Sequence, residues 1–175
     1  DTTIPPEADL SGSVRWFDIV DPVRTPSFAV RGSARAVRAG NDFEWTLEVG
    51  CGVQPLAYTL LGSGSGGGAA IDDEVLVSWA AGDSAAECGF DPALPVEGVD
   101  DHTVTLRLRV LDGFGNLGED RRTVAIHSDP TLRHAPIHLP GSGESSPALA
   151  DVNRDGVLDI VQAGGDGSVH VLDGA

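Results

Sequence analysis

The chain lacks lysine and methionine altogether, and positive charge is scarce throughout its 175 residues. Its 11 arginines stand against 27 acidic side chains, so the formal net charge is −16. A surface of that sign repels the phosphates of DNA and RNA and the head groups of anionic membranes, so we expect no nucleic-acid partner. No apolar run approaches the roughly 20 residues of a membrane-spanning helix, so we expect no membrane insertion either.

Aromatic residues are also scarce, at 5% of the chain, so small and branched aliphatic side chains must fill most of the core. Glycine (23 residues), proline (11) and aspartate (19 of the 27 acids) are abundant. These residues favour turns over long helices. The best helix signal, residues 83–87, predicts one turn at most. The composition therefore favours an all-β fold.

Two segments alternate apolar and polar residues with the period of two that is typical of half-buried strands. Residues 43–49 place aromatic and aliphatic side chains on one face and Glu44 and Glu48 on the other. Residues 103–111 repeat the pattern with two arginines on the polar face. If the two strands share a sheet, these glutamates face the arginines across it, and each exposed pair would stabilise by less than about 1 kcal/mol.

A further strand is predicted at 121–127, and weaker strand patterns cover residues 14–20, 27–34, 57–61 and 75–80. Together they complete a set of about seven short strands, separated by glycine, proline and aspartate turns. So many short strands over about 115 residues are typical of a β-sandwich.

The last two strands flank a tight-turn sequence, DGFGN, at residues 112–116. Residues 102–116 resemble the closing hairpin of bacterial immunoglobulin-like and PKD-type domains, in which a strand, a D-x-x-G-N turn and a final strand follow one another. The resemblance implies an immunoglobulin-like β-sandwich that serves as a spacer or interaction module without chemistry of its own.

Residues 62–67 contain a formal G-x-G-x-x-G match, the spacing of dinucleotide-binding turns. That motif needs a helix directly after the turn, and residues 69–73 are too short to supply one. We therefore expect residues 63–68 to form a mobile loop.

The two cysteines, Cys51 and Cys88, match no zinc-binding spacing. Our interpretation is a disulfide between them, which would stabilise the fold by about 3–4 kcal/mol in the chain-entropy model. Such a bond indicates an oxidising, extracellular compartment. Two unrelated buried thiols are the alternative.

The strongest motif is a nine-residue loop with oxygen-bearing side chains at positions 1, 3, 5 and 9, namely Asp151, Asn153, Asp155 and Asp159. Gly156 permits a sharp bend at position 6, and the carbonyl of Val157 can point inward at position 7. Ca²⁺ takes six to eight hard oxygen ligands, which these five groups and water would supply. The motif therefore predicts bound Ca²⁺, and an acidic turn between strands is the alternative.

The residues after this loop distinguish it from an EF-hand. Position 12 is Gln162 instead of glutamate, and Ile160 and Val161 predict a strand where an EF-hand has a helix. The segment instead resembles the FG-GAP or VCBS repeat, the blade unit of integrin-alpha-like β-propellers, whose pattern P-x-x-x-D-x-(D/N)-x-D-G-x-x-D-(I/L)-V matches from Pro147 onward. The resemblance implies structural Ca²⁺ in the loop of a single propeller-blade-like hairpin. One copy is not a complete propeller, because blades must stack to bury their faces.

We therefore expect an all-β chain of four segments. They are a linker at 1–13, an immunoglobulin-like β-sandwich at 14–128, a second linker at 129–146 and an FG-GAP/VCBS-like calcium-binding repeat at 147–175. This order resembles non-catalytic regions of large secreted bacterial proteins, subtilisin-like proteases among them.

The sequence contains no G-x-S-x-G elbow and no recognisable cysteine–histidine catalytic motif, so we expect no enzymatic activity. The predicted function is that of a calcium-binding module, secreted or at the cell surface, that spaces or stabilises neighbouring domains of a longer parent protein. One alternative is an adhesion or carbohydrate-binding module that binds a protein or glycan ligand through the loops of the sandwich or through the rings of Trp16, Trp45 and Trp79. Another is an accessory fragment of a secreted subtilisin-like protease.

Overall fold

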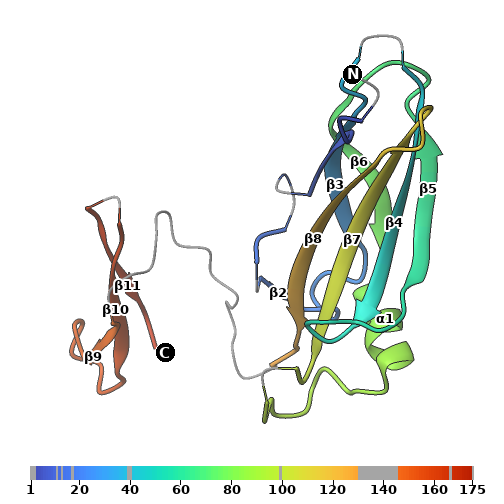
Figure 1. Cartoon of the computed structure of the whole chain (residues 1–175). Helices are drawn as coiled ribbons and strands as arrows, with labels where there is room; N and C mark the ends of the chain where they lie inside the picture. Colours follow the sequence, from blue (N-terminus) through green and yellow to red (C-terminus); the bar gives the residue numbers. More distant parts are fainter. Residues whose placement is uncertain are drawn as a thin grey trace. The chain divides into compact units, whose positions relative to one another are not determined.

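The computed structural model describes residues 3–10, 12, 14–16, 18–38, 41–98, 100–129, 146–165 and 167–174. The chain divides into two compact units, residues 1–133 and 134–175. Strands dominate both units, and the helix found among the described residues is the short α1 (Ala81–Cys88), so the predicted all-β class is confirmed (Figure 1). The linker predicted at 129–146 lies outside the described residues except for Asp129 and Ser146.

The first unit contains two sheets. The larger has the order β2 (Ile19–Val20), β8 (Leu117–Ile126), β7 (Thr103–Asp112), β4 (Phe43–Cys51) and β5 (Thr59–Ser65). The smaller has the order β1 (Glu7–Asp9), β3 (Phe28–Arg35) and β6 (Ile71–Trp79). Figure 1 shows β8, β7, β4 and β5 side by side, with β3 and β6 in a second layer.

Alternate residues of β4 and β7 point into the core of this unit, as their period of two predicts. Leu47 on β4 and Leu106 and Leu108 on β7 are fully buried. Val30 of β3 and Trp79 of β6 belong to the same buried cluster, so the two sheets share one core. Burying each such side chain contributes about 1.5–3 kcal/mol.

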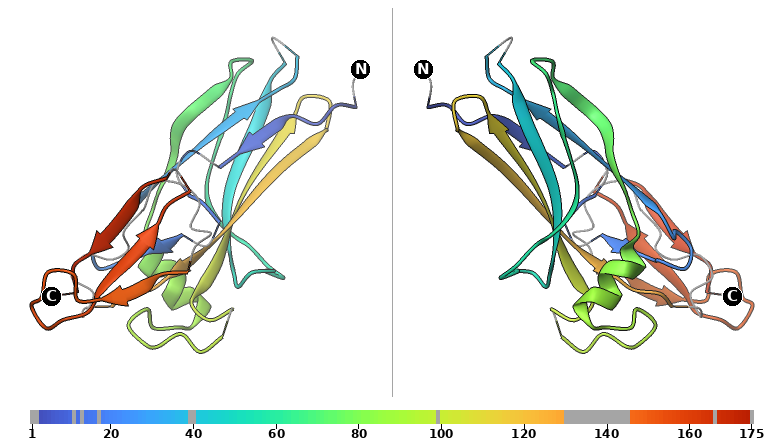
Figure 2. Two further views of the ribbon diagram at one scale, coloured as in Figure 1. Left: turned by 90° about the vertical axis from the view of Figure 1, so that its left-hand side faces the viewer. Right: turned by 90° about the vertical axis from the view of Figure 1, so that its right-hand side faces the viewer.

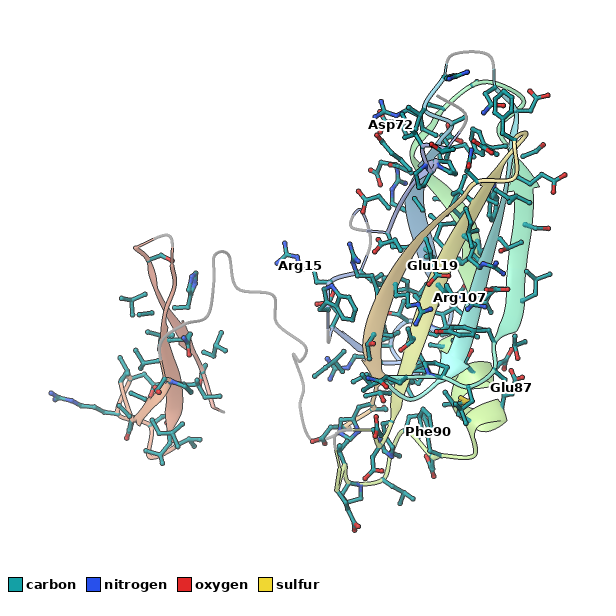
Figure 3. The ribbon with its side chains drawn as sticks, in the orientation of Figure 1. Arg15, Asp72, Glu87, Phe90, Arg107 and Glu119 are labelled. Atoms are coloured by element: carbon teal, nitrogen blue, oxygen red, sulfur yellow. A yellow bond between two sulfur atoms is a disulfide. The ribbon has the colours of Figure 1, made fainter. Side chains whose placement is uncertain are left out.

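On the polar face of β4 and β7, one of the two arginines pairs with a glutamate of β4 as expected, and the other does not. Arg107 lies opposite Glu48, with 2.7 Å between Nη2 and Oε2, and its guanidinium is 3.5 Å from the centre of the Tyr58 ring. Arg109 lies 3.8 Å from Glu119 on β8 instead of pairing with a β4 glutamate. Figure 3 labels Arg107 and Glu119 on these strands.

Residues 7–10 take part in the fold, whereas the composition of residues 1–13 predicted a linker. β1 pairs with β3, and the carboxylate of Glu7 contacts the guanidinium of Arg35. Leu10 is fully buried, and its N–H donates to the Asp120 carboxylate over 2.8 Å. One apolar residue at the end of a polar segment therefore attaches the N-terminal part of the chain to the core.

The glycine-rich segment contradicts the prediction of a loop at 63–68, because β5 continues through Ser65. Gly62 and Gly64 face the core side of the sheet, opposite Leu47 and Trp45 of β4. A Cβ at Gly64 would lie 2.8 Å from three atoms of the Trp45 ring. The glycines therefore leave room for the bulky side chains of β4. Glycine and serine alternate along this part of β5 with the period of two that is typical of a strand.

The helix is longer than the single capped turn predicted for residues 83–87. α1 spans eight residues, and it ends where Gly89 adopts a left-handed φ of 79° and donates its N–H to the Ala86 carbonyl. The indole N–H of Trp79 donates to Ser84 Oγ over 2.9 Å, so the helix is fixed to the core. α1 lies at one end of the strands in both views of Figure 2.

The disulfide predicted between Cys51 and Cys88 is present, with the two Cα atoms 5.5 Å apart. It joins the last residue of β4 to the last residue of α1. Thr59 Oγ1 donates to Glu87 over 2.6 Å and adds a second link between the helix and the sheet. The helix is therefore attached both covalently and by hydrogen bonds to the β4–β5 side of the sheet.

The turn predicted at 112–116 joins β7 to β8. Asp112 accepts hydrogen bonds from the backbone N–H groups of Phe114 and Asn116 and from the side-chain amide of Asn116. Gly115 has a φ of 85°, which the turn requires of a residue without Cβ. The Asn116 side chain, followed by the two backbone donors, lowers the pKa of the Asp112 carboxyl below its ordinary value.

The second unit is a small antiparallel sheet with the order β11 (Val169–Leu172), β10 (Asp159–Ala163) and β9 (Ala148–Ala150). The strand predicted after the acidic loop is β10, so that expectation is confirmed. Asp159 is the buried residue of the unit's described part.

Replacing Gly64 by valine is expected to destabilise the first unit by about 1–3 kcal/mol, because the added carbons overlap the Trp45 ring. Urea unfolding followed by tryptophan fluorescence measures the change. Ser63→Val is the matched control on the exposed side of β5, where a change within about 0.5 kcal/mol is expected. Equal effects of the two substitutions would contradict the close packing of β5 on Trp45.

The pH dependence of stability should report on Asp112. Because folding lowers the pKa of this carboxyl, its stabilising contribution is complete above the unfolded value of about 3.9 and is lost as the pH falls through that value toward the folded one. The difference in unfolding free energy between the native chain and Asp112→Asn should therefore be largest near neutral pH and shrink below about pH 4. The other carboxyls cancel in this difference, so a gap that stays constant down to about pH 3 would contradict it.

Candidate functional site

The candidate site is the loop that joins β9 to β10 in the second unit, residues 151–158. Two of its residues have left-handed backbone conformations, Arg154 with a φ of 65° and Gly156 with a φ of 91°. A left-handed residue reverses the local course of the chain, so two of them within three positions produce a tight turn. The bend predicted at Gly156 is present.

Three predicted ligand residues direct their side-chain oxygens at the loop's own backbone. Asp151 accepts the N–H groups of Asp155 and Gly156, each over 3.0 Å. Asn153 Oδ1 accepts the Asp155 N–H over 3.0 Å, and Asp155 Oδ1 accepts the Val157 N–H over 2.8 Å. The loop is thus organised by the residue types that the calcium motif requires.

The fourth predicted side chain, Asp159, has a different environment. It is 1% exposed at the start of β10, and its two oxygens accept the N–H groups of Val152 over 2.9 Å and Gly174 over 3.1 Å. These bonds, the one from Val152 foremost, lower the pKa of the Asp159 carboxyl. Asp159 therefore links the beginning of the loop to the segment that follows β11.

The sequence interpretation missed Gly174. A Cβ at this position would collide with the carbonyl oxygen of Leu158, so glycine allows the chain to approach Asp159 closely. Gly174 follows Asp159 by 15 residues and carries no side chain, so neither spacing nor residue chemistry identifies the contact.

The described residues do not contain a group of three histidine, cysteine, aspartate or glutamate side chains positioned to hold a metal ion. In the loop, the carboxylates of Asp151 and Asp155 instead bind backbone amides. Each carboxylate oxygen has two lone pairs, so an oxygen that accepts an N–H still has one for a cation. The donor set, three carboxylates, one amide oxygen and the Val157 carbonyl, has the hard-oxygen chemistry that Ca²⁺ prefers.

The sheet around the loop exposes apolar side chains on both faces. Leu149 and Ile160 are cross-strand neighbours on one face, with exposed fractions of 65% and 41%. Val169 and Val171 lie on the other face at 65% and 50%. A three-stranded sheet needs at least one covered hydrophobic face to be stable in water. Among the described residues, neither face of this sheet is covered by other side chains of the unit to the extent that a buried core would be.

The three tryptophans have very different surroundings. Trp45 and Trp79 are buried in the core of the first unit, at 8% and 1% exposure. Trp16 is 54% exposed and lies 5.7 Å from the Arg122 guanidinium. Of the tryptophans considered for ligand binding, Trp16 alone presents its ring to solvent.

Comparisons of the chain with protein-family models, curated proteins and solved structures gave no match. In the part of the chain that the structure describes, no helix has the length and apolar character needed to cross a membrane.

Replacing Asp159 by alanine is expected to release the amides of Val152 and Gly174, because it removes the acceptor for both. Hydrogen exchange followed by NMR on the full chain should show loss of protection at these two amides and along β10. Asp159→Asn keeps one carbonyl acceptor and should have an intermediate effect. Amides of the first unit, such as Leu106, serve as the internal control. Unchanged exchange at Gly174 would contradict the role of Asp159.

Proposed function

We propose that the chain is a non-catalytic, calcium-binding module of an extracellular protein. In this proposal residues 14–128 form an immunoglobulin-like β-sandwich and residues 147–175 an FG-GAP/VCBS-like repeat. Its function is to space or stabilise neighbouring domains of a longer parent protein.

The single observation that carries the proposal is that the side-chain oxygens of Asp151, Asn153 and Asp155 all turn back onto the backbone amides of one curled loop. Three carboxylates within nine residues repel one another, and a divalent cation offsets that repulsion. Asp151, Asn153, Asp155, Asp159 and the Val157 carbonyl would hold the ion, which would supply positive charge at the centre of the loop. Because Asp151 and Asp155 already accept backbone amides, the chain itself orients these oxygens before any cation arrives.

The exposed apolar faces of the second unit support the proposed role toward neighbouring domains. Leu149 and Ile160 on one face and Val169 and Val171 on the other need apolar partners. Further repeats of the same kind would cover them, since a repeat that cannot bury its own face is stabilised by stacking. Calcium in the adjoining loop would stiffen the edge of such a stack.

The Cys51–Cys88 disulfide supports an extracellular location, because disulfides persist in oxidising compartments. Extracellular calcium modules bind the ion at about 10⁻⁴–10⁻³ M. For the alternative of glycan binding, Trp16 is the tryptophan ring available to a ligand beside the loops of the sandwich, since the other two rings lie in the core.

Calcium titration tests the proposal directly. The full chain is first freed of metal with a chelator, and amide shifts are followed by NMR as CaCl₂ is added. We expect shifts confined to residues around 151–159, with a dissociation constant of about 10⁻⁴–10⁻³ M. Mg²⁺ should bind more weakly, since it demands shorter, near-octahedral coordination.

Asp155→Ala should weaken calcium binding at least about tenfold, because it removes a charged ligand at the centre of the loop. The matched control is Asp83→Ala, which makes the same change in charge on the exposed side of α1. No shifts at about 10 mM Ca²⁺, well above the expected constant, would overturn the calcium proposal. If the two substitutions weakened calcium binding equally, the binding would be a non-specific attraction of cations to an acidic chain, and the proposed site would be wrong.

A further inference from the structure

The outer strands of the two sheets in the first unit differ in how they are protected from pairing with another chain. An edge strand presents unpaired N–H and C=O groups, and proteins usually shield such edges with charge, proline or shortness. β6 carries Asp72, Asp73 and Glu74, all exposed, and Figure 3 labels Asp72 there. β1 and β2 are only three and two residues long.

β5 has little of this protection. It is the last strand of the five-stranded sheet, it is seven residues long, and it contains no charged residue and no proline. One bulge interrupts it between Leu60 and Gly62, which leaves a regular stretch at 62–65. Alternate backbone groups of an edge strand point away from the sheet, so this stretch offers an open ladder to a second strand.

The segment that contains β5 is also free of charge. Residues 49–71 contain no charged side chain, in a chain whose net charge is −16. The nearest acids come from other elements: Glu44 and Glu48 of β4 lie opposite Ser65 and Leu60, and Glu87 of α1 accepts a hydrogen bond from Thr59. Two copies of so acidic a molecule repel each other wherever their acidic surfaces meet. Contact through β5 brings the copies together at a strand that carries no charge of its own, with Glu44 and Glu48 one strand further from the contact. The serines and glycines at 62–65 are small residues and allow close approach.

One exposed apolar side chain lies on the same strand. Leu60 is 57% exposed on β5. An antiparallel pairing of β5 with a second β5 is symmetric, because the same residues face one another across a two-fold axis. Such a contact would pair the backbone groups of the edge and bring Leu60 of each copy near the joined sheet.

We propose that the β5 edge is a self-association surface at which two copies of the chain pair antiparallel and join their five-stranded sheets. The contact is much smaller than the roughly 1,600 Å² of a standard interface, so the dissociation constant is expected at about 10–1,000 μM. Added salt should tighten the dimer, because it screens the repulsion between two acidic copies.

Sedimentation equilibrium over this concentration range tests the proposal on the full chain. The mass should rise from 18.0 kDa toward twice that value, and more steeply at higher salt. In a pairing centred within the regular stretch 62–65, Ser63→Glu places a like charge from each copy close to the axis and should raise the dissociation constant at least about tenfold. The matched control, Ser78→Glu, adds the same charge at an exposed position of β6 and should have a much smaller effect.

Cross-linking provides the direct readout. Ser63→Cys should give a disulfide-linked dimer under mild oxidation, whereas Ser78→Cys should not, and circular dichroism checks that both variants are folded. A chain that stays at 18.0 kDa throughout would overturn the proposal and leave the edge without this partner. Equal effects of the two glutamate substitutions, or loss of the dimer in Val171→Asp, would assign association to another surface and overturn it as well.

Discussion

The packing of β4 is the constraint on which the first unit depends. β4 pairs with β7 on one side and β5 on the other, and its last residue, Cys51, is bonded to α1. In a chain with no methionine and few aromatics, Phe43 and Trp45 supply much of the bulk on its inner face. Because the Trp45 ring fills the space beside β5, the residue of β5 that faces it must be glycine or similarly small. The large side chains of β4 therefore explain the glycines of β5. The alternation of β4 likewise explains why its polar side chain Glu48 forms an ion pair on the opposite face of the sheet.

The sequence predicts those parts of the fold whose signal is local. Alternation identifies β4 and β7, and the DGFGN turn identifies the hairpin to β8. It fails where the meaning of a residue depends on a distant neighbour: the glycines of β5 look like a loop until Trp45 is seen beside them. The acidic loop shows the same division. The bend of the loop and the spacing of its oxygen-bearing side chains can be read from the sequence. The hydrogen bond between Asp159 and Gly174 cannot, because these residues are 15 positions apart.

The excess of aspartate over glutamate has a structural explanation beyond solvation. A fold with little helix leaves many N–H groups in turns, and each needs an acceptor. The short aspartate side chain reaches them: Asp21 accepts from Val23, Asp91 from Ala93 and Asp101 from Gly98. The acidity of the chain is thus partly a consequence of building turns with carboxylates. The loop at 151–158 uses the same chemistry at higher density.

The same density of carboxylates bears on the stability of the second unit. Its described part buries one residue, the carboxylate Asp159, and leaves its apolar side chains exposed, so hydrophobic burial among these described residues contributes little. The hydrogen bonds of its carboxylates therefore matter for the described sheet, and in the proposed module packing partners and a bound ion would add to them. Asp151 and Asp155 accept backbone amides, and each carboxylate would keep lone pairs for a cation. Binding would therefore add to an existing loop structure, and the ion and the neighbouring domains would stabilise the same small sheet in parallel.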